Sequence, residues 1–146
     1  MNVEDIREFC LGLPGVTEDS PYGPDMIVFR IEGKIFLHLP LEYADPRISI
    51  KLPPEKGEEL RERYSSAIRA AFHLNKTHWN DILIEHTFPR EQIEEWIMES
   101  YRIVLNKLPK RIRENICHEA HASIYHPSCF LKKKLNCCNF HVAICI

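Results

Sequence analysis

The sequence predicts a single α+β domain in which helices pack on an antiparallel sheet, followed by an irregular tail. Two observations lead to this prediction. Three neighbouring segments between residues 27 and 52 alternate apolar and polar side chains, as strands with one exposed face do. Segments with a helical apolar stripe precede and follow them. Such runs of strands bounded by helices favour α+β over a parallel sheet, and 146 residues suit one domain.

The first predicted helix begins near Val3 and ends near Leu13. Its apolar residues recur at helical spacing, Asn2 is a suitable N-cap, and Gly12 and Pro14 end it. The period then changes from that of a helix to that of strands.

Strands are predicted over residues 27–31 and 35–39, joined by a tight hairpin at Glu32 and Gly33. A third strand covers residues 47–52. One of its faces is apolar, and its other face carries Arg47, Ser49 and Lys51.

The second half of the domain has fewer clear signals. A helix opens at residues 53–55 because Pro is tolerated in a first turn. Two short strands are predicted over 70–73 and 81–84, with a loop at 75–77. A long helix runs from Pro89 to Pro109 with a continuous apolar stripe. The predicted order is helix, three strands, helix, two strands, helix.

Charge and cysteine content separate the last thirty residues from the rest. Residues 1–116 carry 16 Lys and Arg against 20 Asp and Glu, whereas residues 117–146 carry 3 against 1. Composition therefore predicts no strong nonspecific attraction to phosphate backbones. Five of the six cysteines lie in the tail, and a single cysteine in the body fits a reducing compartment. Without a signal peptide or a membrane-length apolar run, we expect a cytoplasmic protein with no membrane contact.

Three stretches in order carry a family resemblance: LPGVTE at 13–18, NKTHWN at 75–80, and SY at 100–101 followed by KLPK at 107–110. Their order and spacing resemble the MmcQ/YjbR family over roughly residues 1–112. The resemblance implies a CyaY-like or secretion-chaperone-like fold over a domain of residues 1–113, with 114–146 as a Cys/His-rich tail outside it. It also implies DNA binding by a double-wing arrangement of the sheet, and it brings no catalytic activity and no cofactor.

The candidate nucleic-acid-binding residues lie on the third strand, in the 75–80 loop and after the last helix. Lys and Arg suit phosphates, Asn suits bidentate contacts, and Trp or His suits stacking. Each group also has a structural interpretation. The strand residues would form a solvated sheet face, the Asn residues would stabilise the turn of the loop, and the cations after the last helix would interact with its negative C-terminal end. The set is Arg47, Lys51, Asn75, Lys76, His78, Trp79, Asn80, Lys107, Lys110 and Arg111.

No catalytic set is predicted. His38 lies on a strand, while His73 and His78 lie near a loop, and the sequence holds no nucleophile elbow, phosphate loop or zinc-protease motif. Cys10 falls on the buried stripe of the first helix, where a thiol is an inert apolar group. We therefore expect a protein that is not an enzyme.

The tail contains enough soft ligands for a zinc site, but no close Cys pair. An abrupt change of composition favours a segment outside the selected fold over a metal site, so no metal is predicted. The weak candidates are Cys117, His118, His121, His126 and Cys129.

Two partners remain open for the domain. DNA requires a contiguous basic surface that includes Arg47, Lys51, Lys76 and Lys110. A protein or peptide partner requires an exposed apolar patch or a free sheet edge. A small-molecule or enzymatic role requires a closed pocket near His73, His78 and Trp79. A monomer is favoured over an oligomer.

Overall fold

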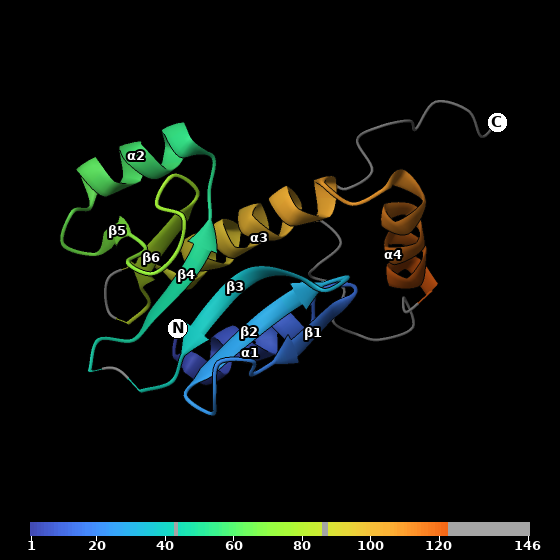
Figure 1. The fold of residues 1–146 in the computed structure, drawn as a ribbon, viewed down its shortest axis with the longest axis horizontal. Helices are drawn as coiled ribbons and strands as arrows, with labels where there is room; N and C mark the ends of the chain where they lie inside the picture. Colours follow the sequence, from blue (N-terminus) through green and yellow to red (C-terminus); the bar gives the residue numbers. More distant parts are fainter. Residues whose placement is uncertain (43, 86–87, 123–146) are drawn as a thin grey trace. The chain divides into compact units, whose positions relative to one another are not determined.

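The computed structural model describes residues 1–42, 44–85 and 88–122 (Figure 1). The chain divides into a first compact unit, Met1–Lys107, and a second that begins at Leu108. The first unit contains, in order, α1 (Val3–Leu11), β1 (Val16–Asp19), β2 (Met26–Ile31), β3 (Lys34–Pro40), β4 (Arg47–Lys51), α2 (Pro54–Arg63), β5 (Ile68–Ala70), β6 (Trp79–Leu83) and α3 (Arg90–Asn106). The second contains α4 (Lys110–Ala122).

The six strands form one sheet in the order β1-β2-β3-β4-β6-β5, and every neighbouring pair is antiparallel. In Figure 1 strands β2 to β4 lie in front, and α1 and α3 lie behind them. The predicted α+β class is confirmed. Within the described residues, no helix is both long and apolar enough to cross a bilayer.

Helix α3 anchors the sheet by packing and by buried hydrogen bonds. Its stripe, including Trp96, Ile97 and Val104, is buried. The hydroxyl of Ser100, which is fully buried, donates to the carbonyl of Phe36 at 2.5 Å and accepts from the backbone N–H of Lys51 at 2.8 Å. A single side chain therefore ties α3 to two adjacent strands.

The β2–β3 hairpin has the predicted two-residue turn. Glu32 and Gly33 have φ of 49° and 77°, the left-handed conformation of a type I′ turn. Its twist matches that of the flanking strands, and it sets the pairing of Ile31 with Lys34 beside the turn, which continues up to a register shift between Phe29 and Arg30.

Two elements are absent from the predicted order. Strand β1 pairs with β2 through Val16 and Ile31, but only one of its four residues is apolar, so alternation does not reveal it. Helix α4 runs through position 113, where an irregular tail was expected. Pro109 follows α3 and immediately precedes α4. The backbone N–H groups of Ile112 and Arg113 donate to its carbonyl, so this proline begins the next helix as well as ending the previous one. Residues 123–146 lie outside the described part of the chain.

Candidate functional site

A row of polar side chains crosses the sheet on the face opposite α2 and α3. Asn80 marks the helix side, because its amide contacts Gly57 and Arg61 of α2. Neighbouring positions alternate between faces, so Asp81 projects the other way. Strand register then places four polar residues in line on that face: His38, Ser49, Asp81 and Arg69, named here the polar row.

The carboxylate of Asp81 is the hydrogen-bonded centre of the polar row. It accepts from the Ser49 hydroxyl at 2.5 Å and from Nε of Arg69 at 3.3 Å. Asp81 is 8% exposed and Ser49 9% exposed. This arrangement corrects the expectation of a fully exposed second face, because the middle of that face is covered.

His38 lies between two aromatic rings. The ring of Tyr22 stacks at a centroid distance of 6.2 Å, and that of Trp79 meets it edge-on at 4.8 Å. Burial lowers the pKa of His38 to about 4, with smaller contributions from the positive charges of Arg30 and Lys51. Its Nδ1 is buried and has no hydrogen-bond partner among the described residues. His38 is therefore a neutral and incompletely satisfied polar group at neutral pH.

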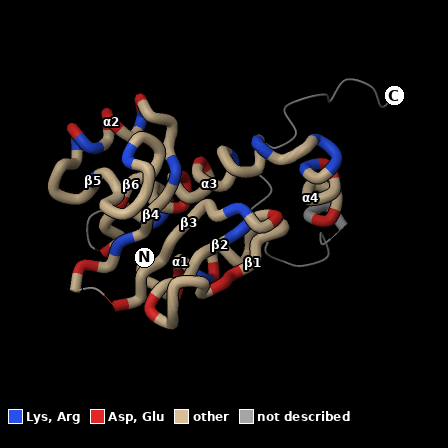
Figure 2. Tube along the Cα trace, in the orientation of Figure 1, with Lys and Arg blue, Asp and Glu red and all other residues tan. Residues whose placement is uncertain are grey.

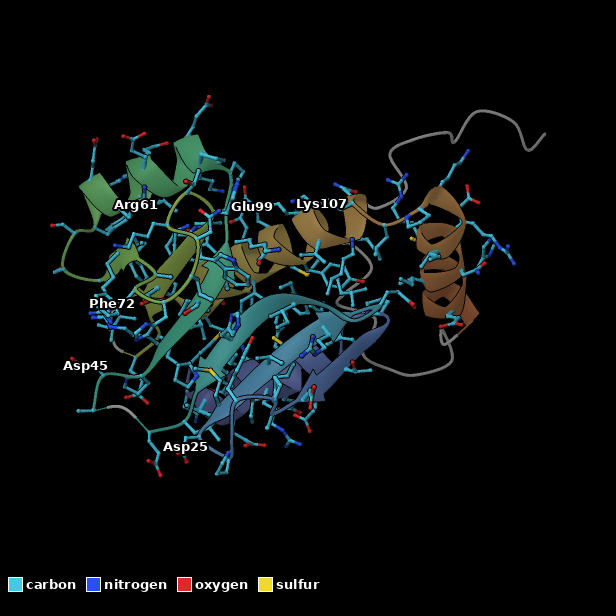
Figure 3. The ribbon with its side chains drawn as sticks, in the orientation of Figure 1. Asp25, Asp45, Arg61, Phe72, Glu99 and Lys107 are labelled. Atoms are coloured by element: carbon cyan, nitrogen blue, oxygen red, sulfur yellow. The ribbon has the colours of Figure 1, made fainter. Side chains whose placement is uncertain are left out.

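A pocket of about 600 Å³ lies over the polar row. All four residues of the row line it, and Arg47 adds a second guanidinium. The remaining walls come from Tyr22 and from the segment after β5, which includes Phe72. In Figure 3 Phe72 projects from the side of the molecule where β5 and β6 lie. The pocket is thus mostly apolar, with a polar floor and two cationic groups.

The polar row contains the residue types of a hydrolytic triad but not its hydrogen bonds. A triad needs histidine between serine and carboxylate, so that the imidazole takes the hydroxyl proton. Here Ser49 donates directly to Asp81, and Nδ1 of His38 bonds to neither. The hydroxyl is oriented by a carboxylate rather than activated by a base.

A second polar feature is formed by three lysines from different elements. Lys34 begins β3, Lys51 ends β4, and Lys107 caps the C-terminus of α3. Burial lowers the pKa of Lys51, and the charges of Lys107 and Lys34 lower it further. No ion pair in the described part of the chain includes any of the three. We name these residues the lysine cluster. It is a local concentration of positive charge, whereas acidic and basic residues are otherwise interspersed (Figure 2).

The 75–80 loop proves to be a turn stabilised by asparagine. The Asn75 side chain accepts from the N–H of Thr77 at 3.0 Å, and its carbonyl accepts from His78 and Trp79. The ammonium of Lys76 lies 6.0 Å from the ring centroid of Phe72. The structural interpretation accounts for Asn75, while His78 and Lys76 remain exposed.

Two residues of this loop that were predicted to contact nucleic acid have buried side chains. Asn80 has no exposed surface; its Oδ1 accepts from Arg61 at 2.5 Å and its Nδ2 donates to the His78 carbonyl at 3.1 Å. Trp79 is 9% exposed, with Lys51 over its ring at 5.1 Å. Neither side chain is available to a base in this conformation, because protein groups occupy their polar atoms or ring faces.

The other predicted basic residues belong to different parts of the fold. Arg47 lines the pocket and donates to the Ala67 carbonyl at 3.1 Å. Lys107 joins the lysine cluster. Lys110 and Arg111 belong to α4 in the second unit, where Lys110 pairs with Glu114 at 3.7 Å.

The tail candidates for metal binding are only partly described. Cys117, His118 and His121 lie on α4, while His126 and Cys129 lie outside the described residues. Across residues 1–42, 44–85 and 88–122, no group of three ligand side chains could hold a metal ion.

Sequence reasoning named His38 and Ser49 separately but did not join them to Asp81 and Arg69. The available signal was a polar residue between apolar neighbours on successive strands, as in Leu37-His38-Leu39 and Ile48-Ser49-Ile50. Only strand order and register show that these residues are adjacent.

The fold and this face define a small single-sheet α+β domain with a pocket on one side, which has apolar walls and a polar floor. The YjbR family model matches residues 11–103. The chain belongs to the YjbR family.

Relatives agree with this assignment over most of their length. The chain is 27% identical to YjbR of Escherichia coli K12 over 78% of this chain and 96% of that protein. It is 31% identical to YbdF of Escherichia coli O157:H7 over 77% and 92%. A DUF419-domain crystal structure from Deinococcus radiodurans matches with a TM-score of 0.74 and 31% identity over 79% of this chain and 87% of that one. A Pseudomonas syringae structure shares the fold, with a TM-score of 0.63 and 24% identity over 71% and 99%.

Proposed function

We propose that this chain is a non-enzymatic, cytoplasmic DNA-binding domain whose lysine cluster contacts the phosphate backbone. The observation that supports it is the convergence of Lys34, Lys51 and Lys107 from three elements, with no acidic partner in the part of the chain that the structure describes. Mutual repulsion between these ammonium groups is relieved when phosphates neutralise them. The non-enzymatic part is supported by the hydrogen bonds of Ser49, which engage it with a carboxylate instead of a base.

The cluster contacts phosphates rather than bases in this proposal. Phosphate contacts position a protein without reading sequence, and the loop residues that would read bases, Trp79 and Asn80, are buried. Because the body carries a net negative charge, only a few phosphate contacts can form, and the affinity for DNA is correspondingly limited. We therefore expect weak binding with little sequence preference. A double-wing docking geometry remains a prediction from the family resemblance.

Strand addition by a peptide is less well supported. Both edge strands of the sheet, β1 and β5, are short. The side chains of β1 are also engaged: Glu18 accepts from Arg7 at 2.7 and 2.6 Å, and Asp19 pairs with Arg30 at 3.4 Å. Short, charged edges disfavour pairing with another strand.

The test is binding of a fluorescently labelled duplex, followed by anisotropy as salt rises from about 50 mM. Three phosphate contacts give a slope of roughly −3 in a plot of log affinity against log salt. The triple variant K34Q/K51Q/K107Q should lose binding and most of this slope.

A matched control removes the same charge from the other predicted residues, as K76Q/K110Q/R111Q. It should retain the wild-type slope, because none of these residues belongs to the lysine cluster. Equal loss in both triple variants would show that only net charge matters, and no binding by the wild type would end the proposal.

A further inference from the structure

The pocket over the polar row is separate from the lysine cluster. In Figure 3 Phe72, on the pocket wall, and Lys107 of the cluster lie at well-separated places in the first unit. None of the three cluster lysines lines the pocket. A phosphate-binding role for the cluster therefore leaves the pocket unexplained.

The charges around the pocket do not cancel. Asp81 contributes one negative charge, already shared between Ser49 and Arg69. Arg47 and Arg69 contribute two positive charges. Among the described residues, Arg47 has one hydrogen-bond partner, the Ala67 carbonyl, and Arg69 has one, Asp81. Each guanidinium offers five N–H donors. One positive charge and several donors thus remain for a bound anion.

His38 adds polarity to the pocket without adding charge. It is 5% exposed, it lines the pocket, and its Nδ1 lacks a partner within the described residues. Buried polar atoms are nearly always hydrogen-bonded. A side chain of this kind, held between Tyr22 and Trp79, is typical of a site completed by a ligand or a water that the ligand orders.

The outer walls of the pocket are apolar and aromatic. Phe72 is 73% exposed and Tyr22 is 68% exposed, the two highest values among the large hydrophobic residues that the structure describes. Both line the pocket, with Met26 and Leu74 beside them. Large aromatic side chains left in water at the mouth of a pocket provide area for an apolar or ring-shaped ligand.

We infer that this pocket binds a small organic monoanion that consists of one apolar ring system and one carboxylate. The carboxylate binds Arg47 and Arg69, which match its planar, bidentate geometry. The ring lies against Phe72 and Tyr22. A volume of about 600 Å³ falls within the range of small-molecule sites. The site uses no residue of the lysine cluster, so it stands independently of DNA binding.

The test titrates the full chain with phenylacetate, benzoate and indole-3-acetate, followed by NMR of backbone amides and aromatic side chains. At least one acid should shift the signals of His38, Ser49 and Phe72. Phenylacetamide, which keeps the ring but lacks the charge, should bind at least about tenfold more weakly, the size expected when one charge-assisted contact is lost.

Variants separate the two halves of the site. Arg69→Met should weaken binding of the acids about tenfold. Arg111→Gln, on α4, should leave their affinity unchanged. Phe72→Ala, at an exposed position that folding does not require, should weaken indole-3-acetate while leaving the far weaker binding of acetate unchanged. If all three acids fail to shift the pocket signals, or if acid and amide bind equally, the inference is wrong.

Discussion

At the residue scale, the sheet face that carries the polar row is organised by side chains whose hydrogen-bond partners come from other strands. Asp81 accepts two hydrogen bonds, while His38, which lies across β4 from it, has no partner at Nδ1 among the described residues. Alternation alone assigned Arg47, Ser49 and Lys51 to one face, as observed. The burial of Ser49 and the identity of its acceptor could not be predicted, because they depend on register between strands 32 residues apart.

His38 links this environment to pH. Its pKa falls from an ordinary value of 6.5 to about 4 on folding. The unfolded chain therefore binds more protons than the folded chain between these values. The stabilisation is fully present above pH 6.5 and is lost as pH falls toward 4. Between neutral pH and pH 5, we expect a loss of roughly 2 kcal/mol in the free energy of unfolding from this group alone.

Urea denaturation at pH 7 and pH 5 measures this loss. The variant His38→Gln should show a smaller difference between the two pH values, even though it is less stable at pH 7. His73→Gln, at an exposed histidine of the same pocket, should keep the wild-type difference. An unchanged difference in His38→Gln would contradict the assignment of the pH dependence to this residue.

At the element scale, local sequence patterns predicted the elements whose own residues specify them. The β2–β3 hairpin follows from two turn residues between alternating segments, and α3 follows from a five-turn apolar stripe. Strand β1 is defined by its partner β2 rather than by its own pattern. Helix α4 was missed because Pro109 was interpreted only as a terminator. Such elements need tertiary information.

The hairpin turn can be tested through its glycine. Gly33 has φ of 77°, and a Cβ there would meet nothing within 4 Å. Gly33→Ala should therefore destabilise the protein through backbone strain alone, by about 1–2 kcal/mol. Gly12→Ala is the matched control, since Gly12 has φ of −75° and its Cβ would make contacts of 3.4 and 3.5 Å.

Chemical denaturation should show a lower midpoint for Gly33→Ala and little change for Gly12→Ala. Equal midpoints for the two variants would mean that the turn does not require the left-handed conformation.

At the scale of the whole molecule, the first unit contains the entire sheet, the pocket and the lysine cluster. It ends at Lys107, and the family match lies within it. YjbR of Escherichia coli K12 is almost fully covered by 78% of this chain. The fold of the family therefore requires none of the cysteine-rich segment that composition set apart.

A chain ended after Arg113 tests this directly. We expect it to keep the sheet and the pocket, because every hydrogen bond of the polar row, and both bonds of Ser100, lie within residues 1–107. Circular dichroism should show cooperative thermal unfolding, and amide spectra should retain the dispersed signals of β3, β4 and β6.

A second chain ended after Ala122 retains α4 and separates the contribution of this helix from that of the residues beyond it. If the chain ended after Arg113 is unfolded while the longer one is folded, α4 is part of the folding unit. In that case a boundary near residue 113 is wrong.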